Sequence, residues 1–388
     1  MGWTHRDRIL AALNHEEADR VPIDLGGAEF STMTVPAYRN LEAHLGMNHE
    51  IKMLSTIHSV VHPHEEVLKR FDVDTRIVLP GGYDNSPHEQ WLDENTYIDT
   101  FGVRWDRTVG NEAVHFLHQD GPFYRGKLTI DDIEAFEWPD GNNPGLISGV
   151  AERVAEIKAM DEEYAVMLYL PGGVIHRGYA MRSFERYLKD LYKNPEALQR
   201  LMTKLCDFWV DTAKQMIEAA GPENIDNVFF GEDLSTQEGC MFDPDGIYAT
   251  YIKPHHRRMV ETVKSYRSDL KIVYHCCGSA YSFIPHLIDI GVDGLNPVQV
   301  TAKNMEPERL KEEFGDKICF WGGINSQSTL PFGTPEEVRA ETRRIISILG
   351  KGGGYVLNSV HNIQPEVPPE NVVAMFDEGM KHRYVHAA

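Results

Sequence analysis

A histidine and a cysteine two residues apart are the sharpest chemical feature of this sequence. His275 and Cys277 lie in the run YHCCG, at the end of an apolar segment. Residues two apart in an extended chain point to the same side, so the imidazole and the thiolate can bind one ion. These donors favour zinc among the common cytosolic metals. The motif alone also fits a buried cysteine pair beside a hydrogen-bonded histidine. Cys276 is expected to point the other way, into packing.

A zinc site takes about three or four protein ligands, so further donors must come from other parts of the chain. The candidates are His361, which follows the last apolar segment, and the acidic pair Glu232 and Asp233. We consider His361 and Glu232 as metal ligands, and all three residues as catalytic candidates. His361 also fits a structural or substrate-binding role, and the acidic pair fits a helix cap or a general acid and base.

Other polar side chains lie at or just after the ends of the predicted strands and are candidates for substrate binding. They are Asp24, Glu29, Asn296, Gln299 and Asn325. Two other groups of histidines, one a cluster without metal-ligand spacing and the other at the start of an apparent helix, are interpreted as surface features. These groups are His58, His62 and His64, and the pair His255 and His256. Cys319 lies within an apolar segment and is expected to serve packing.

The elements that must position these residues alternate between short apolar runs and helical patterns. The eight predicted strands are Val21–Leu25, Arg76–Leu79, Ala165–Leu170, Asn227–Phe230, Lys271–His275, Gly294–Asn296, Lys317–Trp321 and Gly354–Leu357. Such alternation predicts a TIM-like (β/α)8 barrel in a single domain over residues 1–388, whose active site lies at the carboxyl ends of the strands. An open doubly wound sheet is the alternative, but no Gly-x-Gly-x-x-Gly follows the first strand.

Two helices carry clear boundary signals. The run Thr334-Pro335-Glu336-Glu337 has the pattern of a capping box with proline in the first turn. A second helix is predicted to begin after Asn194 and to end at Gly221, with its leucine, methionine and aromatic stripe facing the core.

One segment, at about residues 84–128, interrupts the alternation after the second predicted strand. It contains short β-like pieces, such as Thr96–Ile98 and Val103–Trp105, among many charges and aromatic residues. A segment inserted after a barrel strand lies at the mouth of the active site, so this one is a candidate lid. A solvated hairpin without a role and an oligomer contact are the alternatives.

Composition excludes several classes of function. The 388 residues carry 38 Lys and Arg against 59 Asp and Glu, a net charge of −21, which argues against general binding to nucleic acids or anionic membranes. No run approaches the roughly 18 apolar residues of a membrane span. The N-terminal run MGWTHRDR lacks the apolar core of a signal peptide. We therefore expect a cytoplasmic protein with reduced cysteines, and the sequence allows a homodimer.

Several segments, in this order, make the chain resemble the uroporphyrinogen decarboxylase superfamily over nearly its full length. They are Thr4–Asp24, Tyr274–Val300, Phe320–Asn325, the run Thr334–Glu337 and Gly352–Asn371. The resemblance implies a TIM-like barrel, as expected from the alternation, and two possible chemistries. Decarboxylases of this superfamily act without metal on a porphyrinogen with many carboxylates. Cobalamin-dependent methyltransferases, including the methylcobalamin:coenzyme M type, carry a zinc-binding His-x-Cys and a later cysteine.

The sequence departs from both patterns in ways that affect the expected function. The loop after the first strand contains Glu29 and no arginine, so a polycarboxylate substrate would lack bidentate partners there. His275 and Cys277 match the methyltransferase motif, but His361 stands where the later cysteine is expected. The resemblance thus implies a zinc- and corrinoid-dependent methyltransferase, with a corrinoid protein and a small methyl ether or thiol as partners. A metal-independent lyase is the alternative.

Overall fold

A curled parallel sheet of seven strands forms the centre of the structure, a computed structural model that describes residues 2–108 and 116–383. Its strands follow the order β15-β14-β13-β12-β9-β8-β3. Their bounds are β3 (Thr75–Val78), β8 (Ala165–Tyr169), β9 (Asn227–Gly231), β12 (Lys271–His275), β13 (Gly294–Asn296), β14 (Cys319–Trp321) and β15 (Tyr355–Val356). All seven overlap predicted segments, and the pairing is parallel throughout.

The predicted first strand, Val21–Leu25, is wrong as a strand, although its place in the fold is informative. Pro22 accepts a backbone hydrogen bond from Leu357 at 2.8 Å, and Ile23 accepts one from Asp74 at 2.9 Å. The segment therefore joins the two edges of the sheet. Proline has no N–H, and the Asp74 carboxylate takes the N–H of Ile23 at 2.7 Å. With these donors removed from the ladder, only an isolated bridge forms.

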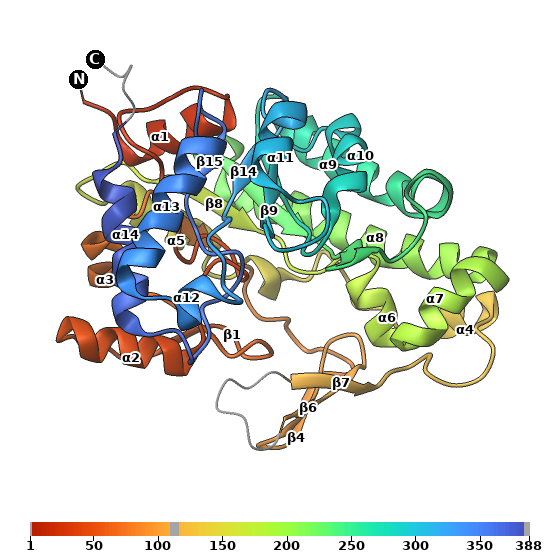
Figure 1. Cartoon of the computed structure of the whole chain (residues 1–388). Helices are drawn as coiled ribbons and strands as arrows, with labels where there is room; N and C mark the ends of the chain where they lie inside the picture. Colours follow the sequence, from red (N-terminus) through yellow and green to blue (C-terminus); the bar gives the residue numbers. More distant parts are fainter. Residues whose placement is uncertain (1, 109–115, 384–388) are drawn as a thin grey trace.

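Helices surround the sheet and connect its strands (Figure 1). They are α1 (His5–Leu13), α2 (Val35–Leu45), α3 (Glu65–Arg70), α4 (Ile130–Ala135), α5 (Val150–Lys158), α6 (His176–Arg182), α7 (Phe184–Lys193), α8 (Pro195–Ala220), α9 (Lys253–Tyr266), α10 (Ile284–Ile290), α11 (Pro307–Phe314), α12 (Thr329–Phe332), α13 (Pro335–Leu349) and α14 (Pro369–Lys381). Short 3-10 helices cover Pro144–Ile147, Pro222–Asn224 and Ala280–Phe283, and a π-helix covers Pro244–Ile252. None of the helices in the described part of the chain is long and apolar enough to cross a membrane.

Both predicted helix boundaries are confirmed. At the start of α13, the Thr334 side chain accepts the N–H of Glu337, and the Glu337 carboxylate accepts the N–H of Thr334. Such reciprocal bonds satisfy two amides that a helix start leaves open. Helix α8 begins at Pro195, stops before Gly221 and buries its apolar stripe. Both helices thus pack in the register expected from the sequence.

The segment after β3 forms a separate antiparallel sheet, ordered β4-β5-β6-β7. Its strands are β4 (Gln90–Asp93), β5 (Thr96–Ile98), β6 (Arg104–Arg107) and β7 (Phe116–Asp120). Figure 1 shows this sheet at the bottom, on the far side of the molecule from the chain ends. Two small hairpins, β1 (Lys52–Ser55) with β2 (Val60–His62) and β10 (Ser235–Thr236) with β11 (Gly239–Cys240), complete the strands. Residues 109–115 of the predicted insertion lie outside the described residues.

Candidate metal centre

Three possible metal ligands, which follow the central strand β12 and the edge strand β15, lie together. His275 is the last residue of β12, Cys277 follows two residues later, and His361 lies in the segment after β15. Their ligand atoms all lie within 4.8 Å of one another. The Cys277 Sγ is 3.4 Å from the His275 Nε2. The parallel strands place their carboxyl ends at one edge, which is why residues 84 positions apart or more can meet.

The ring geometry of the two histidines fits a shared ion. Their ring centres are 5.8 Å apart, and the ring planes are 75° apart. Two imidazoles on one tetrahedral ion, each with its nitrogen about 2.0–2.1 Å away, place their ring centres about 5 Å apart. The described residues contain a second possible group, His49, His64 and Glu66. There the two rings are stacked at 3.6 Å, too close for a tetrahedral pair.

Hydrogen bonds fix the orientation of His275 within this group. Its Nδ1 lies 2.9 Å from the Oδ1 of Asn296, so the Nε2 faces Cys277. Burial lowers the pKa of His275, which favours the neutral imidazole that a metal ligand must be. Partners of this kind are typical of metal-binding histidines.

Asp233 places a carboxylate beside the same atoms. Its Oδ1 accepts the N–H of Cys277 at 2.7 Å and lies 3.8 Å from the Nε2 of His275. Burial raises the pKa of the Cys277 thiol well above its ordinary value, and the charge of Asp233 adds to this rise. A cation at the sulfur would reverse the effect, because a coordinating thiol loses its proton. The arrangement therefore suits a cation.

A cavity of about 680 Å³, which we call the deep cavity, opens onto this group. His275, His361 and Asp233 line one side of it. Its other walls are largely apolar and aromatic. They include Phe30, Leu54, Ile57, Leu79, Trp105, Leu117, Tyr169 and Tyr179. Trp105 and Leu117 belong to the inserted sheet, so this sheet lies at the cavity, whereas its action as a lid remains a prediction.

A charged pair, Glu29 and His58, also lines the deep cavity. Glu29 is 2.5 Å from the Nδ1 of His58 and accepts the Tyr169 hydroxyl at 2.5 Å. Burial alone would raise the pKa of Glu29, but His58 and the hydroxyl outweigh it and lower the pKa to about 2. Burial would lower the pKa of His58, but Glu29 raises it. The pair can therefore hold a proton on the imidazole.

Comparison with known proteins identifies the family. The sequence profile described as uroporphyrinogen decarboxylase (URO-D) matches residues 102–382, most of the chain. The chain belongs to the uroporphyrinogen decarboxylase family. It is 24% identical to the uroporphyrinogen decarboxylase of Alkalilimnicola ehrlichii, over 97% of this chain and 94% of that one. It is 23% identical to that of Psychromonas ingrahamii, over 94% of each chain.

A solved structure shares the fold of this uroporphyrinogen decarboxylase family member. A methyltransferase from Methanosarcina mazei aligns over 98% of this chain and 99% of its own, with a TM-score of 0.65. The two sequences are 17% identical, so the similarity shows the fold alone. Because the seven-stranded parallel sheet agrees with it, the predicted TIM-like architecture is supported, and an open sheet is not.

The structure does not bring Glu232 of this family member into the metal group. Its buried carboxylate accepts the N–H groups of Val174, Ile175 and His176 at 2.6–3.0 Å. It also lies 2.9 Å from the Nε2 of His256. Burial would raise the pKa of Glu232, but His256 outweighs it and the pKa is lowered. With its oxygens held by four partners, Glu232 supports the loop before α6 and is not placed to bind an ion.

The predicted substrate-binding residues separate into two sets. Glu29 lines the deep cavity, and Gln299 lines a neighbouring pocket with Cys277 and His361. Asn296 faces His275. In contrast, Asp24 is fully buried and hydrogen-bonded to Thr75, Trp321 and Asn358, and Asn325 caps a turn through Gln327 and Ser328. These last two therefore hold the barrel together and line none of the cavities described.

Two histidine groups interpreted as surface features are placed differently by the structure. His58 lines the deep cavity, and His256 is buried against Glu232. His176 and Phe30, which the sequence analysis did not select, also line the cavity. The ring of Phe30 stacks on His275 at 4.2 Å. For His256 a signal existed, because it precedes Met259, Val260 and Val263 at helical spacing. The predicted packing roles of Cys276 and Cys319 are confirmed, since both are buried.

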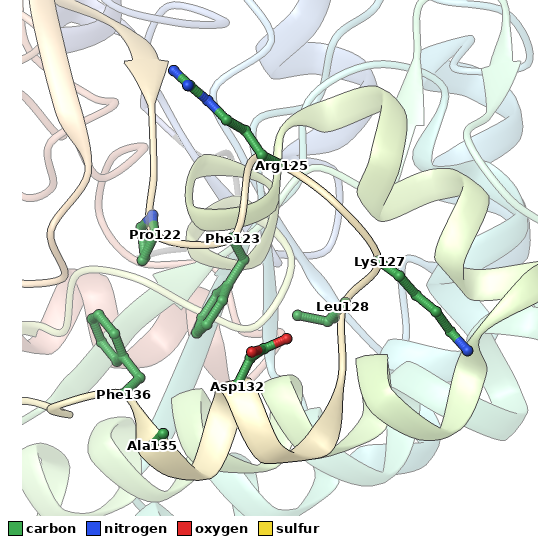
Figure 2. Close-up of a pocket in the computed structure, with 8 residues that line it drawn as sticks. All are labelled: Pro122, Phe123, Arg125, Lys127, Leu128, Asp132, Ala135 and Phe136. Atoms are coloured by element: carbon green, nitrogen blue, oxygen red, sulfur yellow. The ribbon is translucent and has the colours of Figure 1, made fainter.

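Another hollow, of about 350 Å³, lies between the segment 122–128, which follows the inserted sheet, and α4. Figure 2 shows the rings of Phe123 and Phe136 on one side and the basic side chains of Arg125 and Lys127 directed away from it. The one carboxylate there, from Asp132, bonds to Thr129 at the start of α4. This hollow is thus a packing joint without convergent polar groups.

Proposed function

We propose that this protein is a zinc-dependent methyltransferase that moves a methyl group between a small compound and a corrinoid carried by another protein. The convergence of His275, Cys277 and His361, two of which line the deep cavity, is the observation that carries the proposal. Thiolate and imidazole are both donors that zinc binds, and three protein ligands with an open fourth position are the pattern of catalytic zinc sites. The methyltransferase of similar fold supports the proposal only as an example of what such a barrel can do.

The charge of the donor set favours one direction of transfer. His275 and His361 are neutral ligands, so Cys277 alone contributes a negative charge. Zinc on such a set supplies a Lewis acid suited to an ether or phenolic oxygen. We therefore propose removal of a methyl group from a small methyl ether, rather than methylation of a thiol. The methyl group leaves the oxygen for the reduced corrinoid, and the oxygen gains a proton to form an alcohol or phenol.

The residues around the deep cavity fit these requirements. Its aromatic and aliphatic walls bind an apolar body and keep water from the reacting oxygen. Phe30 covers one face of His275 and holds that ring in place. His58, held by Glu29, faces the same cavity and is placed to hold the proton that the departing oxygen needs.

A metal-independent decarboxylase is the second candidate, because the curated relatives carry that name. The cavity argues against a substrate with many carboxylates. Arg177 is the only arginine or lysine among the described residues that line it, and its guanidinium is already paired with Asp99. Glu29 and Asp233 add negative charge to the same walls. Such a wall repels polycarboxylates and accepts neutral compounds.

The proposal is tested by two assays under reducing conditions with zinc-loaded protein. One supplies cob(I)alamin with a panel of methoxylated aromatic compounds, and the other supplies methylcobalamin with thiols. We expect a cobalamin spectral change in the first assay that depends on zinc. Turnover of thiols alone would reverse the proposed direction. Zinc-independent decarboxylation of a porphyrinogen, with no methyl transfer, would replace the proposal by the second candidate.

Replacement of Asn296 by alanine is expected to weaken zinc binding by roughly 10–100-fold, because His275 loses the partner that orients it. The measurement is competition with a chelator of known affinity. Asn325→Ala removes the same amide from the loop after the next strand, where the side chain bonds only a local turn, and serves as the control. Equal zinc affinity of both variants and the wild type would show that Asn296 does not support a ligand.

Replacement of His58 by glutamine is expected to lower thermal stability in a pH-dependent way. Because the pKa of Glu29 is lowered in the fold, the pair stabilises the protein above about pH 4.3, the pKa of a glutamate in the unfolded chain. This stabilisation is lost as the pH falls. Because the pKa of His58 is raised in the fold, the pair stabilises the protein below about pH 6.5, the pKa of a histidine in the unfolded chain. This stabilisation is lost as the pH rises. The difference in melting temperature should thus be largest between about pH 4.5 and 6.5.

Because His58 is partly exposed, this pair contributes no more than about 1 kcal/mol, or roughly 2 °C in a chain of this size. Differential scanning fluorimetry from pH 3 to 9 measures the difference. A difference that is constant over this range would mean that Glu29 and His58 do not interact as an ion pair.

A further inference from the structure

A second cavity, of about 470 Å³, shares two of the candidate metal ligands with the deep cavity's group. We call it the outer pocket. Cys277 and His361 form its inner wall, and His361 also lines the deep cavity. The metal group therefore stands between two spaces. A transfer reaction needs room for two reactants at one centre, and the outer pocket supplies the second space.

The outer pocket is lined by carboxamides to an unusual degree. Four of its residues carry them: Gln299, Gln327, Asn362 and Gln364. No lysine or arginine is among the described residues that line it, and its one carboxylate is that of Glu366. Without a cation, the pocket is a poor site for a phosphate or carboxylate group. Its chemistry suits a neutral ligand that both donates and accepts hydrogen bonds.

The hydrogen bonds of these amides leave complementary positions open. The Nδ2 of Asn362 is buried and has no partner among the described residues. Gln327 uses its Oε1 to accept from Thr301 at 2.6 Å, and Gln364 uses its Nε2 to donate to the Asn362 carbonyl at 3.1 Å. Within the described part of the chain, the Nε2 of Gln327 and the Oε1 of Gln364 make no hydrogen bond. The Asn362 donor is shielded, whereas Gln327 is exposed and Gln364 is half-buried, so the amides of these two glutamines are the open positions that a ligand can reach.

We infer that the outer pocket binds the carboxamide-bearing edge of the corrin ring. A corrin ring carries acetamide and propionamide side chains alternating with methyl groups along its rim, and each carboxamide is both donor and acceptor. Phe332, whose side chain is 78% exposed, and the apolar Pro331 and Val360 offer surfaces for the methyl groups. A volume of about 470 Å³ suits a few such side chains rather than the whole macrocycle. This inference rests on the proposed function and names the site of the second reactant.

The test measures binding of methylcobalamin to the zinc-loaded protein by calorimetry, without a methyl acceptor, so that no turnover occurs. The double variant Gln327→Leu with Gln364→Leu should bind methylcobalamin about 10-fold more weakly or worse, since two hydrogen bonds are lost. Gln90→Leu, which changes an exposed glutamine in β4, is the control. A cobalamin whose rim amides are hydrolysed to carboxylates should bind the wild type more weakly than methylcobalamin does, and the double variant should lose this preference.

The outcomes separate the inference from the proposed function. Equal methylcobalamin affinity of wild type and double variant, with methyl transfer intact, overturns the inference alone. A double variant that loses affinity for the methoxylated substrate instead would assign the pocket to that substrate, and would also overturn it. Absence of both methylcobalamin binding and methyl transfer in the wild type overturns the proposed function, and the inference with it. Zinc content, measured in each variant, should stay unchanged.

Discussion

Replacement of Cys277 by alanine is expected to reduce zinc affinity by more than about 100-fold and to abolish methyl transfer. The thiolate is the one charged donor of the set. Loss of a partner that only orients a ligand already reduces metal affinity by roughly 10–100-fold, and loss of the ligand itself has a larger effect. Metal content after dialysis, determined by plasma mass spectrometry, measures the first effect. The cobalamin spectrum measures the second.

Two cysteine variants make the result specific. Cys240→Ala removes an exposed thiol, and Cys276→Ala removes the neighbouring buried thiol, so both should retain zinc. Circular dichroism should show that all three variants keep their helix content. Unchanged zinc in Cys277→Ala, or equal losses in Cys276→Ala and Cys277→Ala, would contradict the assignment of the ligand.

Replacement of Glu232 by alanine is expected to destabilise the fold by about 3–5 kcal/mol without changing zinc stoichiometry in the folded protein. The change leaves three backbone amides and the buried His256 without their carboxylate partner, and breaking a buried pair has an effect of this size. Urea unfolding followed by tryptophan fluorescence measures the free energy. Glu238→Ala, at an exposed site in the same segment, should change it by less than about 0.5 kcal/mol.

Zinc stoichiometry decides between the two roles considered for Glu232. A variant that is as stable as the wild type but loses its zinc would restore Glu232 as a ligand. The pH dependence gives a second check. Because the pKa of Glu232 is lowered in the fold, its contribution is present above the unfolded value of about 4.3 and is lost as the pH falls. The stability difference between wild type and Glu232→Ala should therefore shrink in acid.

The sequence was sufficient to bring the candidate ligands together, because strand ends in a parallel barrel share one face. His275 and Cys277 could be placed from their spacing, and His361 from its position after the last strand. The same reason applies to Asn296, whose amide oxygen the structure places against His275. Position along the chain thus predicts which side chains share the rim, but not which of them touch.

The parts that could not be predicted depend on side-chain direction and on partners far along the chain. His58 lies between two short strands, and its role follows from Glu29, 29 residues earlier. The position of Glu232 at the end of β9 predicted a functional carboxylate, yet the backbone of the loop before α6 surrounds it. The segment Val21–Leu25 has the apolar pattern of a strand, but Pro22 and the Asp74 carboxylate remove the hydrogen bonds that would extend it.

Zinc K-edge absorption fine structure of the metal-loaded protein tests the three-residue metal centre most directly. We predict one sulfur at about 2.3 Å and nitrogen or oxygen neighbours at about 2.0–2.1 Å, with imidazole scattering from two rings. In Cys277→Ala the sulfur contribution should disappear. A wild-type spectrum without sulfur, or with two or more sulfurs, would contradict a centre built from His275, Cys277 and His361.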